Sequence, residues 1–220
     1  MWRSASEGPK RIVPDGCVDL VVGDGVAFVA GPDTAAWSSV TSSGVVLRGV
    51  RFRPGSAAVV LGVAADELRD RRVPVAELWG WPTAERLLEG EVPPVRAVAE
   101  RLADSPPPDA AVAALIARLD EGVARVADVS FGSGGSRPAG AAPVLPAAVS
   151  ERRLRRRFVQ AVGYGPATYL RVSRFQRAVA LAPRVATLAA LAAAAGYADQ
   201  AHLSRECRAL TGLTPRGYFR

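Results

Sequence analysis

Histidine and cysteine are scarce in this chain of 220 residues, which has one histidine and two cysteines. A single imidazole, His202, cannot supply both a metal-ligand set and an acid–base partner, so the composition argues against most metal enzymes and most histidine-dependent hydrolases. Cys17 and Cys207 lie far apart and follow neither a ligand spacing nor a disulfide framework. The sequence therefore predicts no catalytic residue, no metal site and no cofactor.

Long apolar runs are also missing. The most apolar early stretch, LVVGDGVAFVAG, is interrupted by Asp24 and its flanking glycines, whereas a membrane span needs about 18 apolar residues in succession. The first residues, MWRSASEGPKR, carry no apolar block of the kind that a secretory signal needs. We expect a cytoplasmic protein without a membrane partner.

Positive charge is concentrated in one half of the chain. The net charge of the whole chain is +7, yet residues 1–104 carry a net charge of −2 and residues 105–220 a net charge of +9. Such a potential attracts an anionic partner and speeds its association. The densest run, SERRLRRRFVQ at residues 150–160, is typical of a solvated helix face as well as of a polyanion-binding surface, so charge alone does not decide its role.

Turn-forming residues divide the first half into short segments. PDG, GDG, GPD and SSG separate apolar runs and predict a meander of about five strands that ends with VVLRGVRFR. Helical patterns follow in AAVVLG, ADELRD, AELWGW, AERLLEG and PVRAVAERLAD. The prolines of SPPPDA, residues 105–110, predict a boundary. We expect an α+β protein of two domains: a β-rich domain with short helices at residues 1–104, and an all-α domain at residues 105–220.

An internal repeat is the most informative feature of the chain. VSERRLRRRFVQAVGYGPATYLR aligns without gaps on ADQAHLSRECRALTGLTPRGYFR at an offset of 49 residues. The alignment pairs Gly163 with Gly212, where a helix ends in a left-handed cap. It also pairs Pro166 with Pro215, at the first position of the next helix, which Thr214 is placed to cap.

The helical spacing gives the second helix of each unit, its recognition helix, a buried face and an exposed face. Leu154 and Phe158 share one face of the first recognition helix, as Leu203 and Cys207 do in the second. Arginine and glutamine, which occur on the opposite faces, pair bidentately with guanine and adenine edges. The repeat predicts helix-turn-helix units at about residues 140–163 and 187–212, with a linker helix at about residues 166–182. A helix of that length spans roughly 24 Å, so with its neighbours it places the units about one turn of DNA apart.

The second unit, GYADQAHLSRECRALTGLTPRGYF with LAALAAAA before it, resembles the C-terminal signature of the AraC/XylS family of transcription regulators. SERRLRRRF and GYGPATYLRVSRFQRA resemble that family's first helix-turn-helix and linker helix, so the resemblance covers about residues 110–220. It implies sequence-specific binding to double-stranded DNA. The base contacts that it implies come from Arg152, Arg155 and Arg156 in the first unit and from Gln200, Ala201, His202, Ser204 and Arg205 in the second.

The other basic side chains of the repeat have two interpretations. They are expected to contact phosphate, which takes half or more of the hydrogen bonds in such complexes, and for those on the linker helix a structural role fits equally well. The candidates are Arg153, Arg157, Arg171, Arg174 and Arg208. The first unit also departs from the family pattern, because Pro143 and Pro146 lie in the segment before its recognition helix, and Pro146 inside the supporting helix would cost about 3 kcal/mol.

The N-terminal half resembles the small cupin-like domain of a group of AraC-like regulators, in VPDGCVDLVV, AGPDT, GVRFRPGSAAVVLGV and VPVAELWG. The resemblance implies that this domain senses a small-molecule effector or forms a homodimer. Three hypotheses follow: a regulator under effector control, a constitutive DNA-binding protein whose N-terminal domain only dimerises, and a cupin-like enzyme fused to a DNA-binding module. The absence of histidine before His202 disfavours the third. We expect Cys17 to pack in a strand, with a redox sensor as the alternative.

Overall fold

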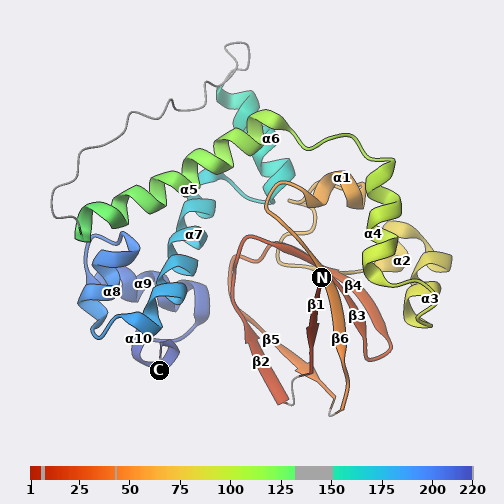
Figure 1. Cartoon of the computed structure of the whole chain (residues 1–220), viewed down its shortest axis with the longest axis horizontal. Helices are drawn as coiled ribbons and strands as arrows, with labels where there is room; N and C mark the ends of the chain where they lie inside the picture. The colour runs from red at the N-terminus through yellow and green to blue at the C-terminus, as the bar shows by residue number, and fades with distance from the viewer. Residues whose placement is uncertain (6–7, 43, 132–150, 220) are drawn as a thin grey trace.

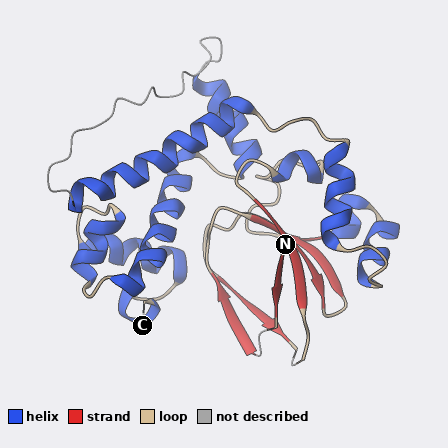
Figure 2. Ribbon diagram, in the orientation of Figure 1, coloured by secondary structure: helices blue, strands red, loops and turns tan. Residues whose placement is uncertain are grey.

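The computed structural model describes residues 1–5, 8–42, 44–131 and 151–219. Strands are confined to the N-terminal part and helices make up the C-terminal part, as Figures 1 and 2 show. The predicted α+β architecture is therefore confirmed. Pro143, Pro146 and the helix that was expected to support the first recognition helix lie outside the described residues.

The described strands are β1 (Trp2–Ser4), β2 (Gly8–Ile12), β3 (Val18–Gly23), β4 (Val26–Ala30), β5 (Trp37–Thr41), β6 (Leu47–Phe52) and β7 (Arg72–Pro74). They form one antiparallel sheet in the order β1-β6-β3-β4-β7 and a second sheet in which β2 pairs with β5. The predicted meander is wrong, because β1, β2 and β3 each pair with strands far along the chain. Turn residues determine where a strand ends, whereas the choice of partner depends on which faces pack together.

The two faces of the five-stranded sheet have different roles. Leu20 of β3 and Val50 of β6 are buried in the core beneath the helices. Asp19 of β3 and Arg51 of β6 point to the opposite side, where the two-stranded sheet lies across a cavity. Because side chains alternate along a strand, the run VDLVVG builds the core with one face and a cavity wall with the other.

Short helices cover the core side of this sheet (Figure 1). They are α1 (Ala57–Leu61), α2 (Val75–Trp79), α3 (Trp81–Leu88) and α4 (Pro94–Ala103). The helix predicted at ADELRD, residues 65–70, is wrong: this segment is a series of turns. It ends at Asp70, which has a φ of 58° and whose carboxylate accepts hydrogen bonds from the Thr34 amide and hydroxyl at 2.6 and 2.8 Å. These contacts with a distant loop override the helical pattern.

The C-terminal helices pack around shared aromatic side chains. Phe158 and Tyr169 meet edge to face with ring centroids 5.8 Å apart, and Phe175 is fully buried. No helix in the described part of the chain is long and apolar enough to cross a bilayer. The elements are α5 (Ala110–Phe131), α6 (Glu151–Val162), α7 (Pro166–Leu181), the 3-10 turn η1 (Ala182–Arg184), α8 (Leu188–Ala195), α9 (Gln200–Thr211) and α10 (Pro215–Tyr218).

Asp109 begins α5 and connects it to α6. Its Oδ1 accepts hydrogen bonds from the amides of Ala111 and Val112 at 2.9 and 3.1 Å, and its Oδ2 accepts one from Arg157 Nε at 2.5 Å. Burial by itself would raise the pKa of Asp109, but the hydrogen bonds from Val112 and Arg157 hold this pKa below its usual value. The charged carboxylate therefore stabilises this junction.

Replacement of Asp109 should weaken the junction in a pH-dependent way. Asp109→Ala should lower the free energy of unfolding by about 1 kcal/mol, the usual cost of losing an N-cap, and Asp109→Asn by less, since an amide oxygen still caps the helix. The lowered pKa means that the contribution of the charge is present above about pH 4 and is lost as the pH falls further. Urea unfolding at pH 7 and pH 3 measures both effects, and equal stability of the wild type and Asp109→Ala at pH 7 would contradict the assignment.

Candidate nucleic-acid interface

The first recognition helix is α6, and its arginines face solvent. Leu154 and Phe158 are buried, as predicted, with Phe158 fully inaccessible. Arg152, Arg155 and Arg156 are exposed on the remaining surface of the helix. Glu151 in the first turn is the one acidic residue among the twelve of this helix. The exposed face of α6 is therefore strongly basic.

The second recognition helix is α9, and its face is less charged. Gln200, Ala201 and Arg205 are exposed. His202 is half-buried, with its ring edge-on to Tyr197 at a centroid distance of 5.1 Å. The Ser204 hydroxyl donates to the Gln200 carbonyl at 2.8 Å. Thus His202 and Ser204 contact other groups of the protein, whereas Gln200, Ala201 and Arg205 are exposed to solvent.

Both recognition helices end as the repeat predicts. Gly163 and Gly212 have φ values of 97° and 73°, in the left-handed region that favours glycine. Pro166 and Pro215 are the first residues of the helices that follow. The Thr214 hydroxyl accepts a hydrogen bond from the Gly217 amide at 3.2 Å, which confirms its predicted capping role.

Several of the predicted phosphate-contact arginines have intramolecular partners. Arg157 pairs with the Asp109 carboxylate, and Arg171 Nε lies 2.5 Å from Glu206 Oε2. The guanidinium of Arg174 stacks over the Tyr197 ring at 5.6 Å. The Arg157 contact joins α6 to the start of α5, whereas the contacts of Arg171 and Arg174 hold α7 against its neighbours and give these two arginines of the linker helix a structural role. Arg153 and Arg208 are exposed.

Contacts from the N-terminal part reach the ends of both recognition helices. The Ala65 amide donates to the Gln160 carbonyl of α6 at 2.7 Å, and the Ala36 amide donates to the Leu210 carbonyl of α9, also at 2.7 Å. These residues cannot be predicted from the sequence, because backbone donors have no residue-type signature and their partners lie far along the chain. Glu206 could not be predicted either, since no local pattern indicates its pairing with Arg171.

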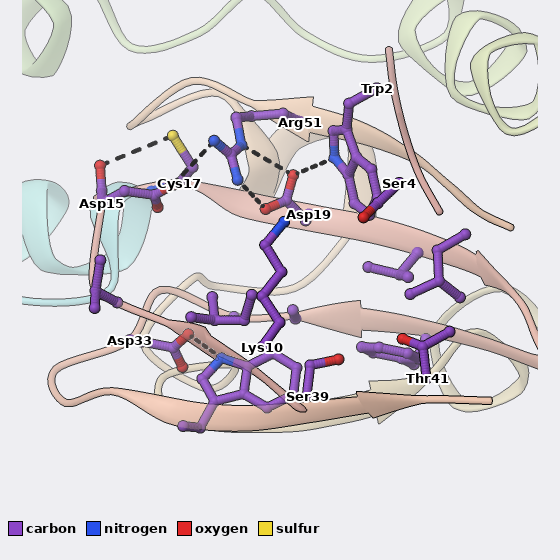
Figure 3. Close-up of a pocket in the computed structure, with 18 of the residues that line it drawn as sticks. Trp2, Ser4, Lys10, Asp15, Cys17, Asp19, Asp33, Ser39, Thr41 and Arg51 are labelled. Atoms are coloured by element: carbon purple, nitrogen blue, oxygen red, sulfur yellow. Dashed lines mark hydrogen bonds and ion pairs between the residues drawn. The ribbon is translucent and has the colours of Figure 1, made fainter. Parts of the chain in front are cut away.

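A cavity of about 450 Å³ lies between the two sheets (Figure 3). Its polar side is built around Arg51, which lies 3.0 Å from Asp15 and 2.9 Å from Asp19. Lys10 extends from β2 across the cavity towards Asp19 in Figure 3. The described residues contain no cluster of three or more histidine, cysteine, aspartate or glutamate side chains that could hold a metal ion. The apolar lining includes Trp2, Ile12, Val21, Phe28 and Trp37.

Cys17 lines the same cavity and is half-buried. Burial and the neighbouring Asp15 carboxylate raise its pKa to about 12, against the opposing effect of Arg51. Cys207, in contrast, is fully buried in the helical core, as predicted. Neither environment favours a reactive thiolate.

The comparisons with known families agree with this geometry. Residues 146–220 match the model of a helix-turn-helix domain, and residues 1–74 match a domain of unknown function, DUF6597. No curated protein and no solved structure matches the chain. The C-terminal part is thus the DNA-binding domain of a helix-turn-helix protein. More narrowly, residues 146–220 form a helix-turn-helix domain of the AraC type, and the match of residues 1–74 supports a cupin-like domain of the kind found in AraC regulators.

Both thiols should react slowly in the folded protein. At pH 7.5, a pKa of about 12 leaves Cys17 with on the order of a thousandth of the thiolate of an ordinary cysteine. Ellman's reagent should therefore label neither cysteine quickly in the native state and both in 8 M urea. Rapid native labelling of one thiol, lost in Cys17→Ser, would contradict this environment and favour the redox-sensor alternative.

Proposed function

We propose that α6 and α9 contact adjacent major-groove segments of an operator and that the protein thereby regulates transcription in the cytoplasm. The observation that carries the proposal is the exposure of Arg156 and Arg205 at matching positions of the repeat, on helices whose other faces are buried. Arginine is the side chain that most often pairs with guanine in the major groove. The two half-sites differ in sequence, because the first face is rich in arginine and the second presents Gln200 and Ala201.

Phosphate contacts supply most of the affinity in this proposal. Arg153 and Arg208 are placed beside the two contact faces, and each phosphate that they neutralise releases counterions. Arg152 and Arg155 extend the basic face of α6, where they contact bases or the adjacent backbone. We further propose that the domain boundary lies between residues 104 and 105, in the segment between the end of α4 and the start of α5.

Removal of the matched arginines tests the contact faces. Arg156→Ala and Arg205→Ala should each weaken binding to the intergenic DNA next to the protein's own gene by about 10- to 100-fold, and relax preference at one base position, as loss of a bidentate base contact does. Arg86→Ala, an exposed arginine on α3, is the matched control. Mobility shifts at physiological salt measure the affinities.

An unchanged affinity and site preference in both variants, beside an unchanged control, would refute the proposed contact faces. A uniform loss of affinity without relaxed preference would reassign the two arginines to phosphate.

The proposed effector site is the cavity between the sheets. Its volume suits a small organic molecule, and Trp2, Phe28 and Trp37 offer flat apolar surface. The carboxylates of Asp15 and Asp19 are already paired with Arg51, so a ligand cation would have to displace that arginine. The ammonium group of Lys10 forms no hydrogen bond or ion pair with the described residues. We therefore infer an effector with a flat apolar body and an acceptor group that faces this ammonium group.

A homodimer is the second candidate role of the N-terminal domain. Apolar side chains remain exposed on its outer helices, at 39% for Leu88, 45% for Val95 and 51% for Leu102. Exposed apolar surface of this kind favours association with a second copy. In that case the domain brings two DNA-binding domains to one operator and needs no effector.

One pair of measurements separates the two roles. If the cavity binds an effector, a screen of aromatic carboxylates should raise the thermal midpoint of the wild type by mass action, and Lys10→Met should abolish the shift. If the domain only dimerises, no compound shifts the midpoint, and sedimentation should show a dimer that Val95→Ser/Leu102→Ser converts to a monomer.

A further inference from the structure

The N-terminal part holds the first helix-turn-helix unit by the end of α6. Besides the bond from Ala65, Arg69 donates to the Gly163 carbonyl at 3.2 Å. Gly163 packs so closely that a Cβ there would lie 2.3 Å from Pro32 Cγ and 3.0 Å from the Ala65 carbonyl oxygen. A glycine is thus required here by its φ of 97° and also by the approach of the neighbouring domain.

The second unit is held at the corresponding place. Arg11 donates to the Thr211 carbonyl at 2.7 Å, next to the bond from Ala36 to Leu210. Between the two units, Gln176 of α7 donates to the Pro14 carbonyl at 2.6 Å. The N-terminal part therefore contacts both recognition helices and the helix that joins them.

One segment of the N-terminal part, residues 31–37, touches both units. Pro32 packs on Gly163 of the first unit, and Ala36 bonds to Leu210 of the second. Asp33, which is buried between them, accepts hydrogen bonds from Arg72 at 2.8 and 3.0 Å and from Trp37 Nε1 at 3.0 Å. These bonds determine the shape of the segment.

The same segment forms part of the cavity wall. Gly31, Asp33 and Trp37 line the cavity, and each is a direct neighbour in the chain of Pro32 or Ala36, the residues that contact the recognition helices. Figure 3 shows Asp33 on this wall of the cavity, with a dashed line for the hydrogen bond that it accepts from Trp37 Nε1. A ligand that packs on Trp37 contacts a side chain that is bonded to Asp33. Because Asp33 and Trp37 are the chain neighbours of Pro32 and Ala36, a displacement of Trp37 also changes the positions of Pro32 and Ala36.

We propose that residues 31–37 couple the cavity to the recognition helices, so that a ligand against Trp37 changes how α6 and α9 are held and thereby the affinity for DNA. The inference rests on the proposed function, since it makes the cavity between the sheets the site of regulation. Coupling of this kind is reciprocal: DNA that favours one arrangement of the helices changes the affinity of the cavity for its ligand by the same factor.

A mild change in the cavity wall tests the coupling without a known effector. Trp37→Phe keeps an aromatic ring but removes the bond to Asp33, and should change the Kd for the intergenic DNA at least fivefold. Trp81→Phe, the same change at a tryptophan that is 67% exposed on α3, should leave the Kd within twofold. In a Pro32→Ala background, where the segment loses part of its packing on Gly163, the effect of Trp37→Phe on the Kd should shrink at least twofold. Equal effects in both backgrounds, or none in either, would overturn the proposal.

Hydrogen exchange of the full chain without DNA gives an independent measurement. The amides of Gly163 and Gly212 donate to the Val159 and Arg208 carbonyls at the ends of the two recognition helices. Trp37→Phe should speed exchange around both amides at least threefold and leave α8 unchanged. Arg11→Met, an exposed replacement with little bearing on folding, should speed exchange around Gly212 alone.

The possible outcomes distinguish a failure of the coupling from a failure of the proposed function. Faster exchange at both helix ends supports the coupling even if the wild type binds no DNA, a result that would refute the proposed function alone. Unchanged exchange in Trp37→Phe overturns the coupling and leaves DNA binding untouched. Faster exchange with an unchanged Kd overturns the regulatory role that we assign to the segment.

Discussion

An α-helix leaves the carbonyl groups of its last turn without partners inside the helix, and both recognition helices of this protein meet that constraint with donors from the N-terminal part. The amides of Ala65 and Ala36 and the guanidinium of Arg11 supply hydrogen bonds to these ends. Because water can replace the protein partner, each such hydrogen bond contributes only about 1 kcal/mol of net stability. These directional contacts, each weak by itself, add to the close packing of Pro32 on Gly163 in joining the two parts.

The two helix-turn-helix units share a framework but differ in what surrounds them. In the second unit, Asp199 caps α9 by accepting a hydrogen bond from the His202 amide at 2.6 Å, and α8 packs beside it. In the first, α6 is joined to α5 through Arg157 and Asp109. Because the exposed faces also differ in charge, the proposed complex has a direction: reversing the order of the half-sites would place an arginine-rich face where Gln200 and Ala201 belong.

The sequence predicted the parts of this structure that depend on local chemistry. Buried positions such as Phe158 and Cys207 follow from helical spacing, and the helix ends at Gly163 and Gly212 follow from glycine's access to positive φ. Strand pairing and the turns at residues 65–70 were missed, because they depend on contacts with distant segments. The same distinction holds for the candidate site. Its exposed faces can be predicted from the repeat, whereas the contact of Ala36 with Leu210 cannot, because it joins segments that are far apart in the sequence.

The polarity of the recognition helices connects these contacts with the proposed binding of DNA. A helix carries partial positive charge at its first turn and partial negative charge at its last. Arg11 and Arg69 of the N-terminal part lie at the negative ends of α9 and α6, where a cation is favourable. In the proposed complex, the exposed arginines of α6 and α9 attract phosphate. Each recognition helix therefore has a last turn that binds cations of the N-terminal part and, in the proposed complex, an exposed face that meets DNA. In the proposed coupling, a shift in the contacts at the last turn moves that face.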